Sequence, residues 1–135
     1  MSFKIVAFFF IMLPNFSFAA CTTKEAAQAE SQILNLKSWG AIYKHYKQFA
    51  KCDDGSIAEG YTESISKMLS NQWSELNNLE NLIKKDEKFK EFVIKHINST
   101  MDEVDRKKIL NNAIKNCNTN LDKLCKNIVH AAESN

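Results

Sequence analysis

The chain has 135 residues, of which 25% are charged, and its formal net charge is only +2. This balance argues against a nucleic-acid-binding protein, because such proteins usually carry a clustered excess of basic residues. The length is that of a single domain, and no low-complexity segment, long linker or evident internal repeat divides the chain.

Residues 1–19 have the pattern of a bacterial secretory signal peptide. Lys4 supplies a positive charge, residues 5–13 form an unbroken apolar run, and the small residues Ser17 and Ala19 stand where signal peptidase reads. As a helix, this run would cover roughly 14 Å of a bilayer core about 30 Å thick, so it does not form a membrane anchor. No later stretch is apolar enough to span a membrane. We therefore predict cleavage after Ala19 and a periplasmic mature protein, residues 20–135, with secretion from the cell as an alternative.

A rival interpretation treats Phe18-Ala19-Ala20-Cys21 as a lipoprotein box in which Cys21 is acylated. The phenylalanine matches such a box poorly. The two interpretations differ at Cys21, because an acylated cysteine cannot also form a disulfide.

After the leader, apolar residues recur every three or four positions, which is the spacing of one-sided helices. Stripes of this kind lie within residues 39–50, 57–69, 89–97, 104–117 and 121–132. An alanine-rich segment from Lys24 and a short segment near 76–84 add two more candidates, and no alternating strand pattern occurs. We therefore predict an all-α fold: a compact single-domain bundle of about six to seven short helices.

Polar residues before these stripes predict where the helices begin. The expected caps are Ser38, Ser56, Asp86, Thr100 and either Thr119 or Asn120. Ser56 and Glu59 have the spacing of a capping box. His96 lies on an apolar stripe, so we expect it to be a core histidine with its ring nitrogens hydrogen-bonded.

All four cysteines lie in the mature chain, and an even number in a small exported domain favours disulfides. The first two predicted helices form a hairpin that turns near Ser38. The midpoint between Cys21 and Cys52 falls on that turn, so an antiparallel hairpin would bring the two together. Cys117 ends one helix, and Cys125 lies one turn into the next. We therefore predict the disulfides Cys21–Cys52 and Cys117–Cys125.

The stretch CDDGSIAEG, residues 52–60, gathers several side chains that could carry chemistry. It lacks the alternating oxygen ligands of an EF-hand loop. Asp53 or Asp54 paired with Glu59 could serve a glycosidase only across a cleft, which nothing in the sequence forms. The structural interpretation is a disulfide, a turn and a capped helix whose positive N-terminus favours nearby acids. The functional interpretation is an acidic patch for a protein partner, formed by Asp53, Asp54 and Glu59.

The other chemistry-bearing residues form no recognisable motif. His45, His96 and His130 fall on three predicted helices, whereas zinc needs three or four converging ligands. Paired cysteines leave no thiolate for a cysteine protease, and no Gly-rich phosphate loop, GxSxG or HExxH occurs. We therefore predict no catalytic residue, no metal site, no cofactor and no enzymatic activity. An enzyme whose site is assembled from scattered residues stays open as another class.

One part of the chain resembles a known family. Tyr46-Lys47-Gln48 leading to Cys52, followed by Ile57-Ala58-Glu59-Gly60-Tyr61, is similar to a cysteine and Ile-Ala-Glu-x-Tyr helix in the periplasmic immunity proteins of type VI secretion amidase effectors. Trp73, the phenylalanine-rich helix and a late cysteine before Leu121 and Leu124 continue the resemblance to about Val129. Residues 53–56 depart from it, because the family has little or nothing between its cysteine and its helix. The arrangement of two cysteine pairs also differs from the family pattern.

The resemblance implies an immunity or inhibitor protein whose partner is a cell-wall amidase effector. Such proteins resemble plugs, because a helix or loop enters the amidase cleft and blocks its Cys-His site. In this chain the CDDG turn and its helix would be the plug, with Asp53, Asp54 and Glu59 as contacts. A periplasmic structural or accessory binding module of unknown partner is the alternative. The sequence leaves monomer and homodimer open.

Overall fold

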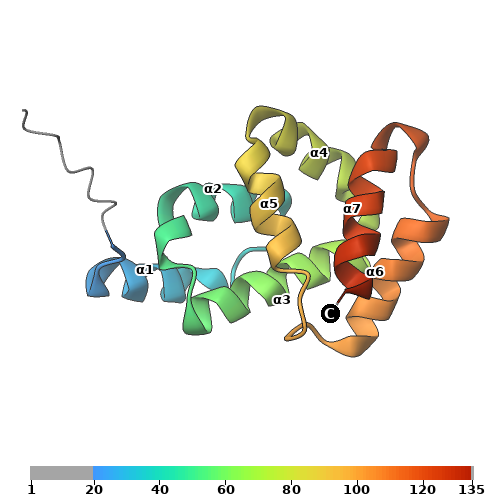
Figure 1. Ribbon diagram of the computed structural model, residues 1–135. Helices are drawn as coiled ribbons and strands as arrows, with labels where there is room; N and C mark the ends of the chain where they lie inside the picture. The colour runs from blue at the N-terminus through green and yellow to red at the C-terminus, as the bar shows by residue number, and fades with distance from the viewer. Residues whose placement is uncertain (1–19, 135) are drawn as a thin grey trace, which may run out of the picture.

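The computed structural model describes residues 20–134, and the predicted signal peptide lies outside them (Figure 1). The described part of the chain contains helices and no β-strand, which confirms the all-α prediction. The seven α-helices in this part are α1 Thr23–Ile33, α2 Trp39–Phe49, α3 Gly55–Asn71, α4 Leu76–Lys85, α5 Glu87–Lys95, α6 Glu103–Lys115 and α7 Asp122–Glu133. Short 3-10 turns precede three of them, namely η1 Ala50–Cys52, η2 Trp73–Glu75 and η3 Thr119–Leu121.

The longest helix, α3, connects the two ends of the bundle. It contacts α1 and α2, which form the N-terminal hairpin, and it contacts α6 of the C-terminal pair α6 and α7 (Figure 1). α4 contacts α2, and α5 contacts α7, so these two helices complete the bundle. Gly60 allows α1 and α3 to pack closely, because a Cβ at this position would lie only 2.3 Å from Ile33 Cγ1.

One cluster of buried apolar side chains forms the core. Its bulkiest members are Trp39, Phe49, Tyr61 and Phe89, and all five predicted stripes contribute to it. A few stripe residues are nevertheless exposed. Ala50 belongs to η1 rather than to α2. Val104 and Ile114 are each 61% exposed, because α6 buries only the narrow face that carries Ile109 and Ala113.

Several predicted helix starts need correction. Ser38 does cap α2, accepting a hydrogen bond from the Ala41 N–H. The N-cap of α3 is Asp54, two residues before the predicted Ser56, whose hydroxyl instead donates to Glu30 Oε1 at 2.7 Å. The predicted capping box is therefore absent.

The other three predicted caps have different outcomes. Asp102, not Thr100, caps α6 through hydrogen bonds from the N–H groups of Val104 and Asp105. Asp86 stands at the start of α5 as predicted, but its carboxylate binds Lys47 at 3.1 Å rather than the helix. The chain enters α7 from η3, so neither Thr119 nor Asn120 caps that helix. Among residues 20–134, no helix combines the length and the apolar character needed to cross a bilayer.

Candidate functional site

The two disulfides have the predicted connectivity. Cys21 is bonded to Cys52, with a Cα–Cα distance of 5.0 Å, and Cys117 is bonded to Cys125, with a Cα–Cα distance of 6.3 Å. The first bond joins the start of α1 to the end of η1, which lies just after α2. A paired Cys21 has no thiol to accept a lipid, so this connectivity opposes the lipoprotein interpretation.

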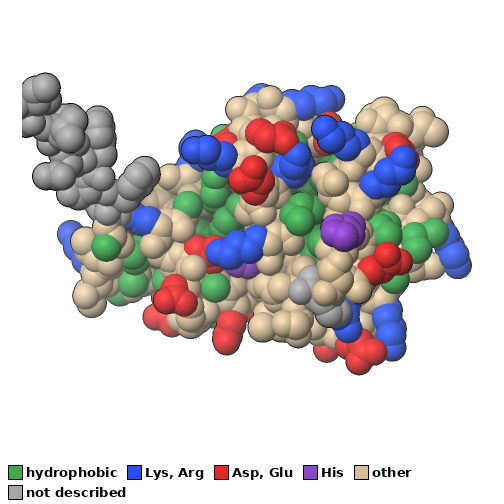
Figure 2. All heavy atoms as spheres, viewed as in Figure 1, with side chains coloured by type: hydrophobic (Ala, Val, Ile, Leu, Met, Phe, Trp, Pro, Cys, Tyr) green, Lys and Arg blue, Asp and Glu red, His purple; other side chains and the backbone are tan. Residues whose placement is uncertain are grey.

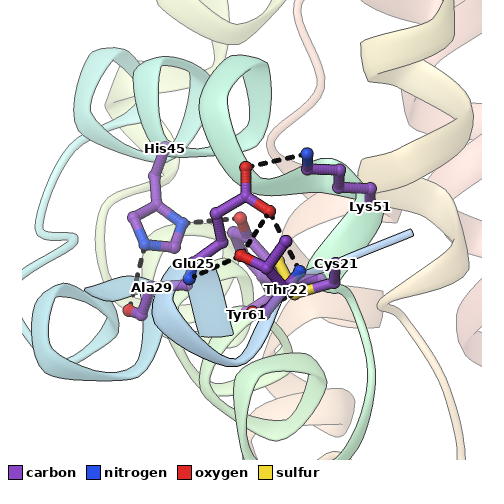
Figure 3. Close-up of a disulfide and its surroundings, with 8 residues drawn as sticks. Cys21, Thr22, Glu25, Ala29, His45, Lys51 and Tyr61 are labelled. Atoms are coloured by element: carbon purple, nitrogen blue, oxygen red, sulfur yellow. Dashed lines mark hydrogen bonds and ion pairs between the residues drawn. A yellow bond between two sulfur atoms is a disulfide. The ribbon is translucent and has the colours of Figure 1, made fainter. Parts of the chain in front are cut away.

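Polar contacts reinforce the chain around the Cys21–Cys52 bond (Figure 3). Thr22 and Glu25 form a capping box at the start of α1. Glu25 also pairs with Lys51, the residue before Cys52, at 2.8 Å. Hydrogen bonds from Lys51 and Thr22 lower the pKa of Glu25 to about 2. The two chain segments on either side of the disulfide are therefore also joined by an ion pair.

Asp53, the residue after this disulfide, points into the protein. Its side chain is only 7% exposed, and it pairs with Lys95 Nζ at 2.6 Å. The ring of the buried His96 lies on the same carboxylate, with Nε2 3.2 Å from Oδ1 and 3.3 Å from Oδ2. Burial raises the pKa of Asp53, but hydrogen bonds from His96 and Lys95 outweigh it and hold the pKa below its ordinary value. Asp53 is therefore an internal carboxylate rather than a surface one.

The polar contacts continue from His96 to α3. His96 Nδ1 lies 3.0 Å from Thr62 Oγ1, and Asn98 Nδ2 donates to the same oxygen at 3.5 Å. Asp53, His96 and Thr62 are all largely buried. We call these three residues the polar relay, because each contacts the next through one hydrogen bond. The expectation that His96 is a hydrogen-bonded core histidine is confirmed.

His45 belongs to a separate contact (Figure 3). Its Nε2 lies 3.1 Å from the carbonyl oxygen of Ala29 and must donate to it, so Nδ1 accepts from the Tyr61 hydroxyl at 2.5 Å. Burial lowers the pKa of His45 and raises that of Tyr61. A neutral His45 thus joins α1, α2 and α3, which is a structural role.

The other two predicted contact residues face outward. Asp54 and Glu59 are exposed on either side of the first turn of α3. Asp54 lines a shallow groove of about 540 Å³ that also runs along the disulfide, Lys51 and Ser56. Glu59 lines a different pocket, of about 400 Å³, between α3 and the start of α6. The structure therefore separates the three predicted acids, with Asp53 inside and the other two exposed beside different pockets.

No protein-family model, curated protein or solved structure matches this chain. The interpretation of the site consequently depends on its own residues. Within residues 20–134, no group of three or more His, Cys, Asp or Glu side chains is placed to hold a metal ion.

Sequence reasoning did not find the partners of Asp53. Lys95 and His96 follow it by more than forty positions, and no local spacing connects them. Two signals were present, however. A histidine on an apolar stripe needs a polar partner when it is buried, and a carboxylate directly after a disulfide cysteine has a fixed position from which to provide one.

Proposed function

We propose that the protein is an exported immunity or inhibitor protein that occludes the active site of a peptidoglycan-degrading effector. The segment proposed to enter that site is the inhibitory loop, which we define as residues 53–59. This loop includes the turn after Cys52 and the beginning of α3. The single observation that carries the proposal is that contacts on two sides hold the start of this loop in place, although part of the loop is exposed to solvent.

On one face, the Cys21–Cys52 disulfide and the Lys51–Glu25 ion pair fix the chain entering the loop. On the other face, Asp53 is bound to Lys95 and His96. Gly55 then turns the chain at a φ of +52°, a conformation that favours glycine. A loop held in this way loses little conformational entropy when it binds, which is a general feature of tight inhibitors.

The charge available to a partner comes from Asp54 and Glu59, because Asp53 is already paired inside the protein. Two exposed carboxylates on this rigid segment would attract a cleft with a basic rim and increase the rate of association. The proposal therefore assigns Asp53 to holding the loop in place and assigns Asp54 and Glu59 to contacting the partner.

The test uses the mature, oxidised protein and the purified product of the reading frame next to its gene. We expect one-to-one capture and loss of that protein's hydrolysis of purified peptidoglycan. Full hydrolytic activity at a saturating amount of this chain would contradict the proposal, provided that both proteins are folded.

Charge variants then locate the contact surface. Asp54→Asn combined with Glu59→Gln removes two charges, while asparagine still suits an N-cap position. We expect this pair to weaken binding by about tenfold at low salt, mainly through slower association. Asp122→Asn is the matched control, because Asp122 is an exposed acid in the first turn of α7. Equal affinities for the double variant and the control would remove the inhibitory loop from the interface.

A further inference from the structure

The polar relay has a defined proton arrangement. The pKa of Asp53 is lowered, so its carboxylate is ionised at neutral pH and accepts the Nε2–H of His96. In the neutral ring, Nδ1 then has a lone pair facing Thr62 Oγ1 at 3.0 Å. The Asn98 amide donates to that oxygen, which leaves the hydroxyl proton directed at Nδ1. A hydroxyl bonded to a base, which a carboxylate orients in turn, is the arrangement that activates nucleophiles in acyl transfer.

The hydroxyl end of the polar relay opens on the surface pocket that Glu59 also lines. Thr62 lines this pocket of about 400 Å³, whereas His96 and Asp53 lie behind it and do not. The volume is in the range of small-ligand sites. A molecule in this pocket would reach the hydroxyl without reaching the base or the acid.

The pocket is negatively charged. Its acidic side chains come from α3 and from the N-terminal part of α6, and they are Glu59, Glu63, Asp102 and Asp105. Among the described residues that line it, Lys67 has the only positive charge, and this lysine is paired with Glu63. Such a lining favours positively charged molecules over neutral or anionic ones.

We propose that Thr62 is a nucleophile that attacks the carbonyl carbon of positively charged esters bound in this pocket. The Thr62 Oγ1–H bond breaks and its proton moves to His96 Nδ1, while Oγ1 bonds to the carbonyl carbon. The bond from that carbon to the leaving group then breaks, and the leaving group takes a proton from a water molecule in the pocket, which leaves hydroxide. This hydroxide attacks the carbonyl carbon of the Thr62 ester, and the Oγ1 that is released takes its proton back from His96 Nδ1. The net reaction consumes one water and involves no oxidation or reduction.

In this reaction Thr62 and His96 are catalytic residues. Asp53 is a positioning residue, because it acts through the imidazole ring and stabilises its charged form. The inference does not rest on the proposed inhibitory function, although Glu59 belongs both to the inhibitory loop and to this pocket. The pocket shares no lining residue with the groove beside the disulfide, and the test below uses the isolated protein.

The first experiment treats the mature, oxidised protein with a fluorophosphonate and locates the adduct by peptide mass spectrometry. We expect one adduct, on Thr62. Thr62→Ser should keep the labelling and Thr62→Val should abolish it. Ser70→Ala is the matched control, because Ser70 is another buried hydroxyl of α3 that does not line the pocket. Its labelling should equal that of the wild-type protein.

The second experiment compares p-nitrophenyl esters of acylated lysine and acylated norleucine, which differ mainly in charge. We expect the lysine ester to be hydrolysed about tenfold faster, with the difference shrinking at high salt. An adduct on any residue other than Thr62 would overturn the inference, and so would no adduct under conditions that label a known serine hydrolase. The location of the adduct in the wild-type protein decides the matter even if Thr62→Val fails to fold.

Discussion

The two disulfides secure opposite ends of the molecule in different surroundings. Cys21–Cys52 closes a sequence separation of 31 residues, and the residue after it, Asp53, has a largely buried carboxylate. Cys117–Cys125 closes a separation of only 8 residues. It joins α6 to α7, two helices that already pack along each other. The comparison suggests that the N-terminal disulfide positions a loop, whereas the C-terminal one reinforces a contact that the helices make without it.

The charged side chains near the two disulfides differ in how deeply they are buried. Figure 2 shows Lys, Arg, Asp and Glu side chains over the outer surfaces of the helices. Some ion pairs that these side chains form, such as Lys126 with Asp122, are exposed on both sides. The contact between Asp53 and His96 differs from these pairs, because both of its side chains are almost fully buried. Removing a charged group should therefore lower the free energy of unfolding more near the N-terminal disulfide than near the C-terminal one.

The largest expected difference comes from removing each disulfide in turn. In the loop-entropy description, Cys21→Ser with Cys52→Ser costs about 3.7 kcal/mol, and Cys117→Ser with Cys125→Ser costs about 2.6 kcal/mol. Urea unfolding followed by circular dichroism measures both. The N-terminal variant should also lose protection of the amides in residues 53–59 in hydrogen exchange. Equal losses of stability, with these amides still protected, would contradict the division of roles.

An intermediate effect is expected from the buried charge. Asp53→Asn should lower the free energy of unfolding at pH 7 by about 2 kcal/mol, since it removes a largely buried carboxylate that accepts hydrogen bonds from Lys95 and His96. Asp122→Asn should change it by less than about 0.5 kcal/mol, because its pair with Lys126 is exposed.

The same variant tests the pH dependence. The pKa of Asp53 is lower in the folded protein, so its contribution is present above its unfolded pKa of about 3.9 and is lost as the pH falls further. Wild-type stability should therefore decline more steeply than that of Asp53→Asn between about pH 4 and pH 2. Parallel curves over this range would show that folding does not lower the pKa of Asp53.

The smallest effect concerns glycine in the loop. Gly55→Ala should destabilise the protein by about 1 kcal/mol, because residue 55 has a φ of +52°. Gly40→Ala is the control. Gly40 lies inside α2, where a Cβ would meet only Ser38 Oγ at 4.0 Å, so alanine should stabilise the protein by about 0.5–1 kcal/mol. Thermal unfolding of the two variants gives both values, and a shift of the same sign for both would remove the special role of Gly55.

The fold could be predicted because it depends on sequence patterns that are local, or that are symmetric about a turn. The spacing of apolar residues predicts the helices. Cys21 and Cys52 lie at equal distances in sequence from the turn of one hairpin, and this symmetry predicts that they pair. The start of α3 could not be predicted in the same way. Asp54 and Ser56 are both good caps, and the choice between them depends on Glu30 of α1, which binds the Ser56 hydroxyl.

The candidate site was predicted only in part. The inhibitory loop was identified as the notable segment, but its acids were expected to act together. Asp53 turns inward because Lys95 and His96 neutralise it there, and these residues come from a distant helix. The contact of Thr62 with His96 was invisible for a related reason: a threonine within a helical segment gives no indication of what it faces.

The order of the disulfides along the chain has a consequence for how the protein is made. Each cysteine is bonded to the next one in sequence, the first to the second and the third to the fourth. A chain oxidised as it emerges from a translocation channel would meet its native partner first at each step. Thiol exchange that corrects wrong pairs takes seconds to hours. Oxidative maturation of this protein can therefore proceed in order of emergence, without depending on an isomerase.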